Sequence, residues 1–328
     1  MPKPGRPRSG SMQFWPRVRA KREYPRVRGF LAGKEAKLQG FAGYKVGMTH
    51  IIITDGRKNS ITKGDDISIP VTIVECPPLK INGFRTYKTT CNTLHPAEDF
   101  LAKADKELSR RLTPAKKELK KPDSITTADF DELRIIVQTQ PKMIGIGKKK
   151  PEVFEVRIGG SKDEKLAFAK ENLGKELSIK DVFSEGQLVD IHAVTKGKGF
   201  QGPVKRFGVR VRNHKSEKTK RGPGSLGGWS GQGHFMYRVA HAGQMGYHNR
   251  PDYNKQIMMI GDDPEQVNAD GGFIRYGKVK NTYLLLKGSV PGPTKRMLRL
   301  ETAGRPNKLV EQVAQTIQYV SKRSPQGN

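Results

Sequence analysis

The chain has 328 residues, the length of one large domain or two ordinary ones, and it is long enough to bury a substantial core. Its 61 Lys and Arg outnumber 32 Asp and Glu, which gives a formal net charge of +29, and hydrophobic residues make up only 34%. This balance argues against an ordinary small-molecule enzyme. It favours a partner with dense negative charge, either nucleic acid or an anionic membrane.

The membrane alternative is poorly supported, because the longest apolar runs, such as those at 51–53 and 284–286, fall far short of the ~20 residues of a spanning helix. The N-terminal MPKPGRPRSG lacks the apolar part of a secretory signal. We therefore expect a cytoplasmic protein without a membrane partner. Cys76 and Cys91 supply neither a disulfide framework nor a four-ligand zinc site, so we expect two small buried apolar residues in a reducing compartment.

Most of the charge lies in two stretches. Residues 1–34 hold ten Lys and Arg and one acid, Glu23, while residues 196–250 hold twelve and one acid, Glu217. These +9 and +11 leave only +9 for the other 239 residues. The second stretch also contains 12 of the 36 glycines and four of the seven histidines. A Gly- and Lys-rich segment without apolar periodicity cannot offset its ordering entropy alone, so we expect two basic appendages that become fixed only against a partner.

The remaining body is predicted to be mostly β. Short apolar, β-branched runs bounded by Gly, Pro, Asn or Asp indicate strands within 41–56, 67–79, 83–91, 133–140, 151–160, 186–195, 271–279 and 281–290. Many short strands with turn signals are typical of a closed or nearly closed barrel. The predicted fold class is therefore mainly β with helical insertions (α+β).

Two helices are predicted among these strands. Residues 161–174 begin with Ser161 and Glu164 at capping-box spacing and stop at Gly174. Residues 97–112 place Phe100, Leu101, Ala104, Leu108 and Leu112 on one helical stripe. Eight bases and nine acids in 98–133 make that insertion a poor candidate for RNA contact. The predicted organisation is a basic N-terminal arm (1–40), first barrel strands (41–95), a helical insertion (96–134), barrel strands with a short helix (135–195), a basic Gly-rich loop (196–255), and final barrel strands with a C-terminal tail (256–328).

The glycine motif GKGFQG at 197–202 satisfies the dinucleotide-binding pattern and, through Val204, a kinase-like extension. A dinucleotide site needs a helix directly after the glycines, and the following PVKRFGVRVRNHK is too basic, too β-branched and too Gly-interrupted to form one. Catalytic H-R-D and D-F-G motifs are absent from the sequence. We expect instead that the glycines and flanking lysines approach a nucleic-acid backbone.

The histidines of the second basic stretch allow other hypotheses. His234, His241 and His248 are spaced by seven, but no carboxylate or thiolate is at hand to complete a metal site, and a triad with Ser225, Ser230 or Asp252 lacks a nucleophile elbow. We therefore expect no catalytic residue, no metal and no cofactor.

Aromatic residues lie between the cations of both stretches, as suits a surface that neutralises phosphates and stacks on unpaired bases. They include Trp15 in the arm and Phe200, Phe207, Trp229, Phe235, Tyr237 and Tyr247 in the loop. An open alternative is that Phe235, Tyr237 and Val239 alternate along a strand. No helix-turn-helix, zinc finger or basic zipper is visible, so an extended arm threaded between RNA helices fits better than DNA reading.

Four segments in the same order along the chain, GYKVGMTHI, VTKGKGFQGPVKRFG, AGQMGYHNR and LLLKGSVPGPTKRMLRL, resemble signatures of the large-subunit ribosomal protein L3 family, archaeal type. The resemblance implies a translation-protein-type β-barrel, with the N-terminal extension and the long loop penetrating rRNA. It further implies a primary binder near the three-prime end of the large-subunit rRNA that nucleates assembly, with ribosomal proteins L14 and L24e as neighbours. By position, Trp229 resembles the family's tryptophan at a finger tip that approaches the peptidyl-transferase centre.

We therefore predict a non-enzymatic structural constituent of the large ribosomal subunit, not a homo-oligomer, whose arm and loop neutralise rRNA phosphates. Two alternatives stay open: an enzyme acting on nucleotides or RNA, and a free-standing RNA chaperone. The predicted rRNA-binding residues are Arg6, Arg8, Trp15, Arg17, Arg19, Lys21, Arg22, Arg26, Arg28, Lys196, Lys198, Gly199, Phe200, Lys205, Arg206, Arg210, Arg212, His214, Lys215, Lys218, Lys220, Arg221, Trp229, His234, Arg238, His241, Gln244, His248 and Arg250.

Overall fold

The computed structural model describes residues 9–27, 33, 35–57, 59–113, 120, 122–216, 218–227 and 238–324. Its strands are β1 (Gly40–Thr54), β2 (Asp66–Glu75), β3 (Leu79–Thr90), β4 (Thr93–Leu101), β5 (Glu132–Gln138), β6 (Val153–Arg157), β7 (Glu176–Leu177), β8 (Leu188–Val194), β9 (Phe200–Gln201), β10 (Gly243–Gln244), β11 (Asn249–Gly261), β12 (Tyr283–Lys287), β13 (Met297–Thr302) and β14 (Ile317–Val320). The α-helices are α1 (Lys162–Glu171) and α2 (Pro203–Phe207). Short 3-10 helices occupy Leu108–Arg110, Pro122–Ser124, Thr127–Asp129, Pro141–Met143, Ile179–Asp181 and Pro264–Gln266. The fold is mainly β, as predicted.

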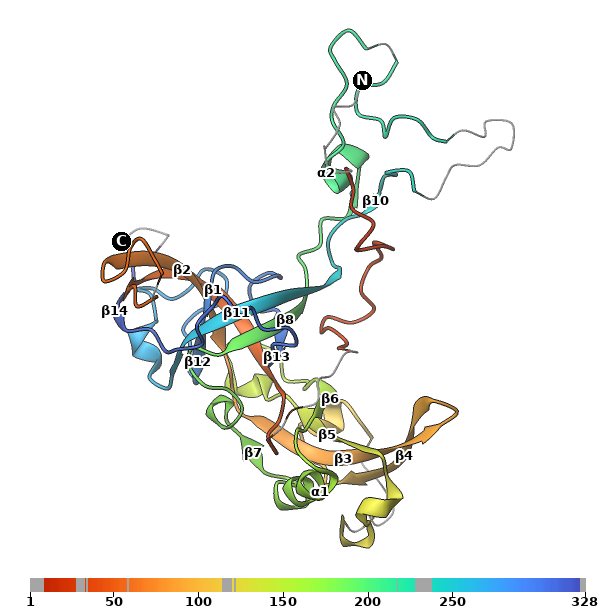
Figure 1. Ribbon diagram of the computed structural model, residues 1–328. Helices are drawn as coiled ribbons and strands as arrows, with labels where there is room; N and C mark the ends of the chain where they lie inside the picture. The colour runs from red at the N-terminus through yellow and green to blue at the C-terminus, as the bar shows by residue number, and fades with distance from the viewer. Residues whose placement is uncertain are drawn as a thin grey trace. The chain divides into compact units, whose positions relative to one another are not determined.

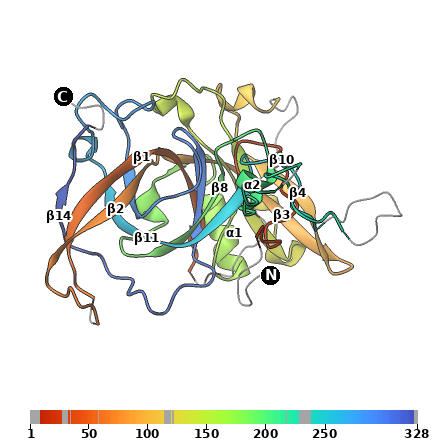
Figure 2. The ribbon, with the colours of Figure 1, turned by 90° about the horizontal axis from the view of Figure 1, so that it is seen from above.

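Seven strands form the larger sheet, in the order β13-β8-β11-β12-β2-β1-β14. Strand β13 also pairs with β1, so the pairings close on themselves through six strands, and β14 is attached to β1. Figures 1 and 2 show these strands curving round a common interior. Fully buried Phe41, Ile51, Ile73, Leu285 and Leu298 belong to this core.

A second sheet has the order β4-β3-β5-β6, with β7 paired to β3. Helix α1 packs against β5 (Figure 1). Its Leu166 and Ala169 are buried. The capping box predicted for α1 is confirmed, because the Glu164 amide donates to the Ser161 hydroxyl and the Glu164 carboxylate accepts from the Ser161 amide. Gly174 follows the helix at φ +80°, as a C-terminal stop signal requires.

The helix predicted over 97–112 is wrong. Residues up to 101 belong to β4, and only Leu108–Arg110 form a short 3-10 turn. Phe100 pairs across the sheet with Phe84, and their rings stack at 4.9 Å between centroids. This cross-strand aromatic pair accounts for the burial of Phe100 that the helical spacing also matched.

The strand predicted over 271–279 is also wrong. This segment is a turn closed by a bridge between Phe273 and Gly277, with positive φ at Gly271, Gly272, Arg275 and Gly277. Conversely, β4, β13 and β14 were not among the predicted strands. Strand β11 begins at Asn249, inside the range predicted to be loop.

Cys76 is buried, and burial raises the pKa of its thiol. Cys91 is exposed at φ +49° in the turn between β3 and β4, so the expectation that it is buried is wrong. Within the described residues, no helix has the length and apolar character needed to cross a membrane.

The chain forms two compact units. Unit 1 combines residues 1–23 with 194–250, and unit 2 combines 24–193 with 251–328. The sequence predicted two separate basic appendages, whereas the structure groups the first 23 residues with the long loop.

Candidate nucleic-acid interface

The base of the long loop in unit 1 is a two-stranded ladder. Strands β9 and β10 pair, and the amides of Lys198 and Met245 donate to the carbonyls of Met245 and Gly199, each at 2.9 Å. Gly246 turns at φ +70°, and a Cβ there would lie 2.1 Å from the Lys196 carbonyl oxygen. Only glycine fits so close an approach.

Helix α2 follows GKGFQG directly, so the expectation that no helix forms there is wrong. Pro203 occupies its first turn and Gly208 ends it in the left-handed region, a pairing that suits even a five-residue helix. Pro203 has no amide hydrogen to offer a pyrophosphate. The only described strand partner of β9 is the antiparallel β10, so the described residues do not form the parallel βαβ unit of a dinucleotide site.

Arg206 joins the two sides of the loop and the N-terminal arm. Its Nε donates to the Gln244 carbonyl at 2.9 Å, Nη1 to the His241 carbonyl at 2.8 Å and Nη2 to the Arg17 carbonyl at 3.4 Å. Burial lowers the pKa of Arg206, and the charge of Arg17 lowers it further. A guanidinium nevertheless stays charged at neutral pH, so a cation holds three carbonyls of one small unit together.

Phe207 is the apolar centre of unit 1 and is 7% exposed. The Arg17 guanidinium lies 4.2 Å from its ring centroid, the Arg206 guanidinium 4.9 Å, and the Trp15 ring 5.7 Å. Gly10 completes the contact, because a Cβ there would lie 2.5 Å from the Phe207 ring. The arm therefore packs on α2 through an aromatic ring flanked by two cations.

His248 is buried and fastens the arm to the base of the loop. Its Nδ1 lies 2.8 Å from the Val18 carbonyl, and because a carbonyl only accepts, Nδ1 carries the proton. Burial lowers the pKa of His248, the Val18 hydrogen bond opposes this, and the charges of Arg250, Arg17 and Arg206 lower it further. The imidazole is therefore neutral near pH 7 and structural.

Two further arginines stack within unit 1: Arg250 lies 4.9 Å from the Phe14 centroid and Arg19 lies 5.4 Å from that of Tyr247. Gln244 donates its side-chain amide to the carbonyls of Met245 and Gly246. These roles were not foreseen from the sequence, although the interleaved aromatics and cations were the available signal.

The other predicted residues are mostly exposed. Trp15, Arg17, Arg206, His241, Gln244 and Arg250 are half-buried, while the exposed set is Arg19, Lys21, Arg22, Arg26, Lys196, Lys198, Gly199, Phe200, Lys205, Arg210, Arg212, His214, Lys215, Lys218, Lys220, Arg221 and Arg238. Arg26 belongs to unit 2 and the rest to unit 1. The predictions for Arg6, Arg8, Arg28, Trp229 and His234, and the alternative strand through Phe235 and Tyr237, lie outside the described residues. No group of three described His, Cys, Asp or Glu side chains is arranged to hold a metal.

Five exposed loop cations of unit 1 form no ion pair with a described carboxylate. In the described chain, no Asp or Glu pairs with Lys196, Lys198, Lys205, Arg210 or Arg212. An anionic partner can therefore reach these cations without displacing an internal ion pair.

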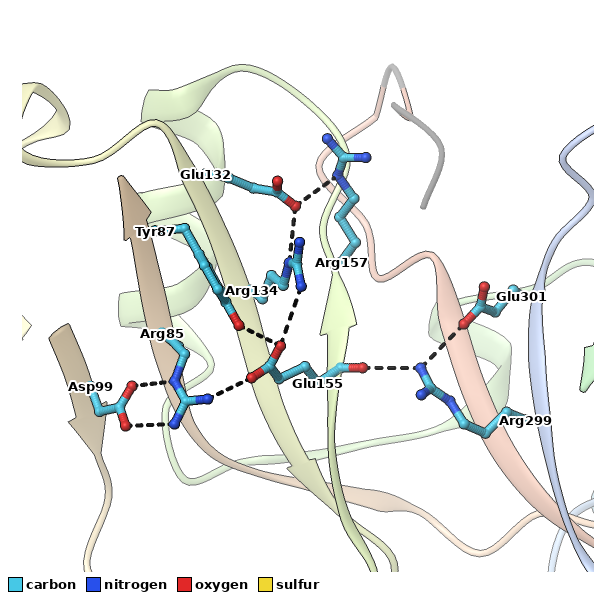
Figure 3. Close-up of polar contacts among 9 residues, drawn as sticks. All are labelled: Arg85, Tyr87, Asp99, Glu132, Arg134, Glu155, Arg157, Arg299 and Glu301. Carbon is cyan, nitrogen blue, oxygen red and sulfur yellow. Dashed lines mark hydrogen bonds and ion pairs between the residues drawn. The ribbon is translucent and has the colours of Figure 1, made fainter. Parts of the chain in front are cut away.

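The arginines of the second sheet in unit 2 show the opposite arrangement (Figure 3). Arg85, Arg134 and Arg157 lie in register on β3, β5 and β6, where like charges would repel. Arg85 forms a bidentate pair with Asp99 and a further pair with Glu155 at 2.7 Å.

Glu132 lies 3.1 Å from Arg134 and 3.4 Å from Arg157, so one carboxylate serves two of these arginines. Arg299 on β13 donates to the Glu155 carbonyl at 3.0 Å and to Glu301 at 3.1 Å (Figure 3). Burial raises the pKa of Glu301 to about 7, against the opposing effect of Arg299. Carboxylates and carbonyls inside unit 2 pair with these arginines, so we regard them as structural. The unit 1 cations without such partners are the ones open to an anionic partner.

A family model described as "Ribosomal protein L3" matches residues 1–327. Among similar proteins, the "Large ribosomal subunit protein uL3" of Methanothermobacter thermautotrophicus is 47% identical over 332 residues, covering 98% of both chains. The protein of the same name from Methanobrevibacter smithii is 46% identical over 332 residues, and that from Archaeoglobus fulgidus is 45% identical over 329, each again covering 98% of both chains.

Proposed function

Since this chain belongs to the ribosomal protein L3 family, we propose that it is a non-catalytic structural constituent of the large ribosomal subunit in the cytoplasm. Its partners are then rRNA and neighbouring ribosomal proteins. The match covers nearly the whole chain, including both basic stretches, so the proposal draws on every part of the molecule.

Unit 1 is the proposed rRNA-binding element. The single observation that carries this is that no described carboxylate pairs with the exposed loop cations Lys196, Lys198, Lys205, Arg210 and Arg212. They lie on a scaffold built by Arg206, Phe207 and His248. Phosphate contacts need cations and close-lying backbone, and both are present here. If eight such cations contact phosphate, affinity for a simple RNA duplex falls by roughly three to five orders of magnitude between ~50 and ~200 mM salt.

The finer assignments rest on the family resemblance. The closed six-strand pairing supports a translation-protein-type barrel on the subunit surface. We further propose binding near the three-prime end of the large-subunit rRNA, a nucleating role in assembly, neighbours L14 and L24e, and extension of the loop through Trp229 toward the peptidyl-transferase centre. Positional support, rather than chemistry, is the proposed contribution there.

Sedimentation of cell extract through a high-salt gradient tests the proposal. The protein is expected to travel with large subunits, because burial and multivalent contact resist salt in a folded particle. Recovery at the top of the gradient would overturn it, and recovery on many unrelated RNAs would favour a free RNA chaperone. Tight binding of ATP or NAD to the purified chain would favour the enzyme alternative.

A further inference from the structure

A cavity of about 810 Å³ lies in unit 2, where four barrel strands meet β6 of the second sheet. Strands β1, β8, β11 and β13 contribute to its lining, together with Val156 and Arg157 of β6. All of its lining residues belong to unit 2, so the cavity is separate from the proposed rRNA-binding element. Its volume falls within the ~300–1,000 Å³ of pockets that bury a ligand.

Two carboxylates lie directly opposite each other at this cavity. Asp190 on β8 is the register partner of Glu301 on β13, and both residues line the cavity. Their neighbours Ile191 and Leu300 are fully buried in the core, so the alternation of each strand directs the two carboxylates to the outer face of the sheet. Like charges directly opposite each other destabilise a sheet. The pair therefore needs a source of positive charge.

The two carboxylates are satisfied unequally. One oxygen of Asp190 accepts from the Asn254 amide and the other from the Gly304 amide, each at 2.9 Å. Glu301 accepts from Arg299 with one oxygen, at 3.1 Å. Its second oxygen has no partner among the described residues, and Figure 3 shows it directed away from Arg299. One acceptor of the pair is therefore open.

Glu301 is divided between its two protonation states at neutral pH. Burial raises its pKa to about 7, the Arg299 guanidinium opposes this, and the charge of Asp190 raises the pKa further. A cation at the open oxygen would favour the ionised carboxylate and offset its repulsion by Asp190. The cavity is therefore suited to a positively charged ligand.

The other ionisable residues that line the cavity do not supply this cation. Arg157 pairs with Glu132 at 3.4 Å. Arg305 is exposed and forms no ion pair within the described parts of the chain. Burial lowers the pKa of His192, the charge of Arg299 lowers it further and that of Asp190 opposes this, so the imidazole is neutral near pH 7.

The walls of the cavity favour a cation carried on an apolar stem. Val156 and Ala303 line it, as does Tyr253, which is 54% exposed. A lysine or arginine side chain can lay its methylene groups on such a surface and place its charged group at a carboxylate. An exposed tyrosine ring also attracts cations. A phosphate would instead face two carboxylates, so a basic protein segment fits the cavity better than an RNA backbone.

We propose that this cavity receives a lysine or arginine side chain of a neighbouring basic protein, with Glu301 as the acceptor of its charged group. The inference rests on the proposed function, which places the chain beside other nucleic-acid-binding proteins rich in Lys and Arg. The chain carries a net charge of +29, so a basic neighbour is repelled by most of its surface. A local site of negative charge offsets that repulsion and selects where the neighbour docks.

The test uses the full chain and a blocked peptide with a single lysine, acetyl-AGAKAGA-amide. The same peptide with glutamine in place of lysine is the uncharged reference. NMR shifts of the His192 imidazole report binding at the cavity. At pH 8 we expect the lysine peptide to bind about tenfold or more tightly than the reference, as a hydrogen bond to a charged group requires. Affinity should fall about tenfold between pH 8 and pH 6, because Glu301 is ionised in only about a tenth of the molecules at pH 6.

Two variants locate the peptide. Glu301→Gln should weaken binding of the lysine peptide about tenfold at pH 8 and remove most of the difference between pH 8 and pH 6. Tyr253→Ala changes an exposed side chain and should weaken binding about threefold with the pH dependence retained. The matched control, Glu176→Gln, removes an exposed acid that does not line the cavity, and its affinity should match that of the wild type. Thermal unfolding verifies that each variant is folded.

The outcomes separate this inference from the proposed function. Equal binding of the two peptides, or an equal loss in Glu301→Gln and Glu176→Gln, would overturn the inference. Tighter binding of spermidine or Mg²⁺ than of the lysine peptide would assign the cavity to a free cation and also overturn it. Binding of a short RNA duplex is measured on the same proteins and should be unchanged in Glu301→Gln. RNA binding without peptide binding would leave the proposed function standing, whereas peptide binding without RNA binding would contradict the proposed function alone.

Discussion

Replacing Arg206 by Lys separates a structural role from phosphate neutralisation. Lys keeps the charge, but its ammonium can make only some of the contacts of the Arg206 guanidinium, which donates to three carbonyls and lies over the Phe207 ring. Losing two hydrogen bonds from a charged donor removes about 2–3 kcal/mol of stability from the packing of the arm on the loop. The opened population should then rise about 30- to 150-fold, since each 1.4 kcal/mol is tenfold.

Amide hydrogen exchange measures this opening. The Ala20 amide donates to the Tyr247 carbonyl across the arm and loop at 2.8 Å, so its exchange should accelerate in the Arg206→Lys protein. The salt slope of RNA binding should stay unchanged in that variant, whereas Arg212→Gln should lower the slope by roughly one and leave the exchange of Ala20 unaltered. Unchanged exchange of the Ala20 amide in the Arg206→Lys protein would refute the reasoning, because the arm would then stay packed on the loop without the three carbonyl contacts of Arg206.

Three other outcomes are expected. Glu75→Gln should destabilise unit 2 by about 2–4 kcal/mol, because the amide nitrogen of Gln would face donors that the buried carboxylate now satisfies, including the Tyr276 hydroxyl. Urea unfolding with an unchanged m-value measures this loss, and wild-type stability would contradict it. His248 should titrate below its usual ~6.5. As the pH falls below ~6.5, the unfolded state therefore binds more protons than the folded state, and the contact between His248 and Val18 weakens. NMR titration of the imidazole and amide exchange measured at pH 7 and pH 5 test this. A His248 pKa above 6.5 would contradict it. Gly246→Ala should open the β9–β10 ladder, because its Cβ would collide with a carbonyl oxygen; loss of amide protection at Met245 is the readout, and retained protection would argue against the ladder geometry.

Local signals were predictable from the sequence. The capping box of α1 is confirmed because Ser161 and Glu164 satisfy each other's backbone within three residues. The apolar spacing around Phe100 also matched a helix. Phe100 lies in a strand instead, where it stacks on Phe84, sixteen residues earlier on a neighbouring strand. Periodicity reports that a residue is buried more reliably than it reports which element buries it.

The sequence predicted which residue types form the candidate interface, but not the contacts that hold it together. Clustered Lys, Arg and Gly indicated where the open cations are. The hydrogen bond from Arg17 to the Arg206 carbonyl joins residues 189 positions apart, and nothing local marks such a pair. The sequence could not show that Arg17, Arg206 and His248 hold the unit together while their neighbours stay exposed.

The packing of the arm on α2 and Phe207 also has a consequence for the order in which the chain is made. Residues 9–23 leave the translating ribosome first, but the segment that receives them is complete only at Arg250, 227 residues after Glu23. At about 5–20 residues per second, the arm waits about 10–45 s for its docking site. During that interval Trp15 and Arg17 are uncovered on a strongly cationic nascent segment. Premature termination anywhere between these points would release a chain whose first segment never acquires its native partner.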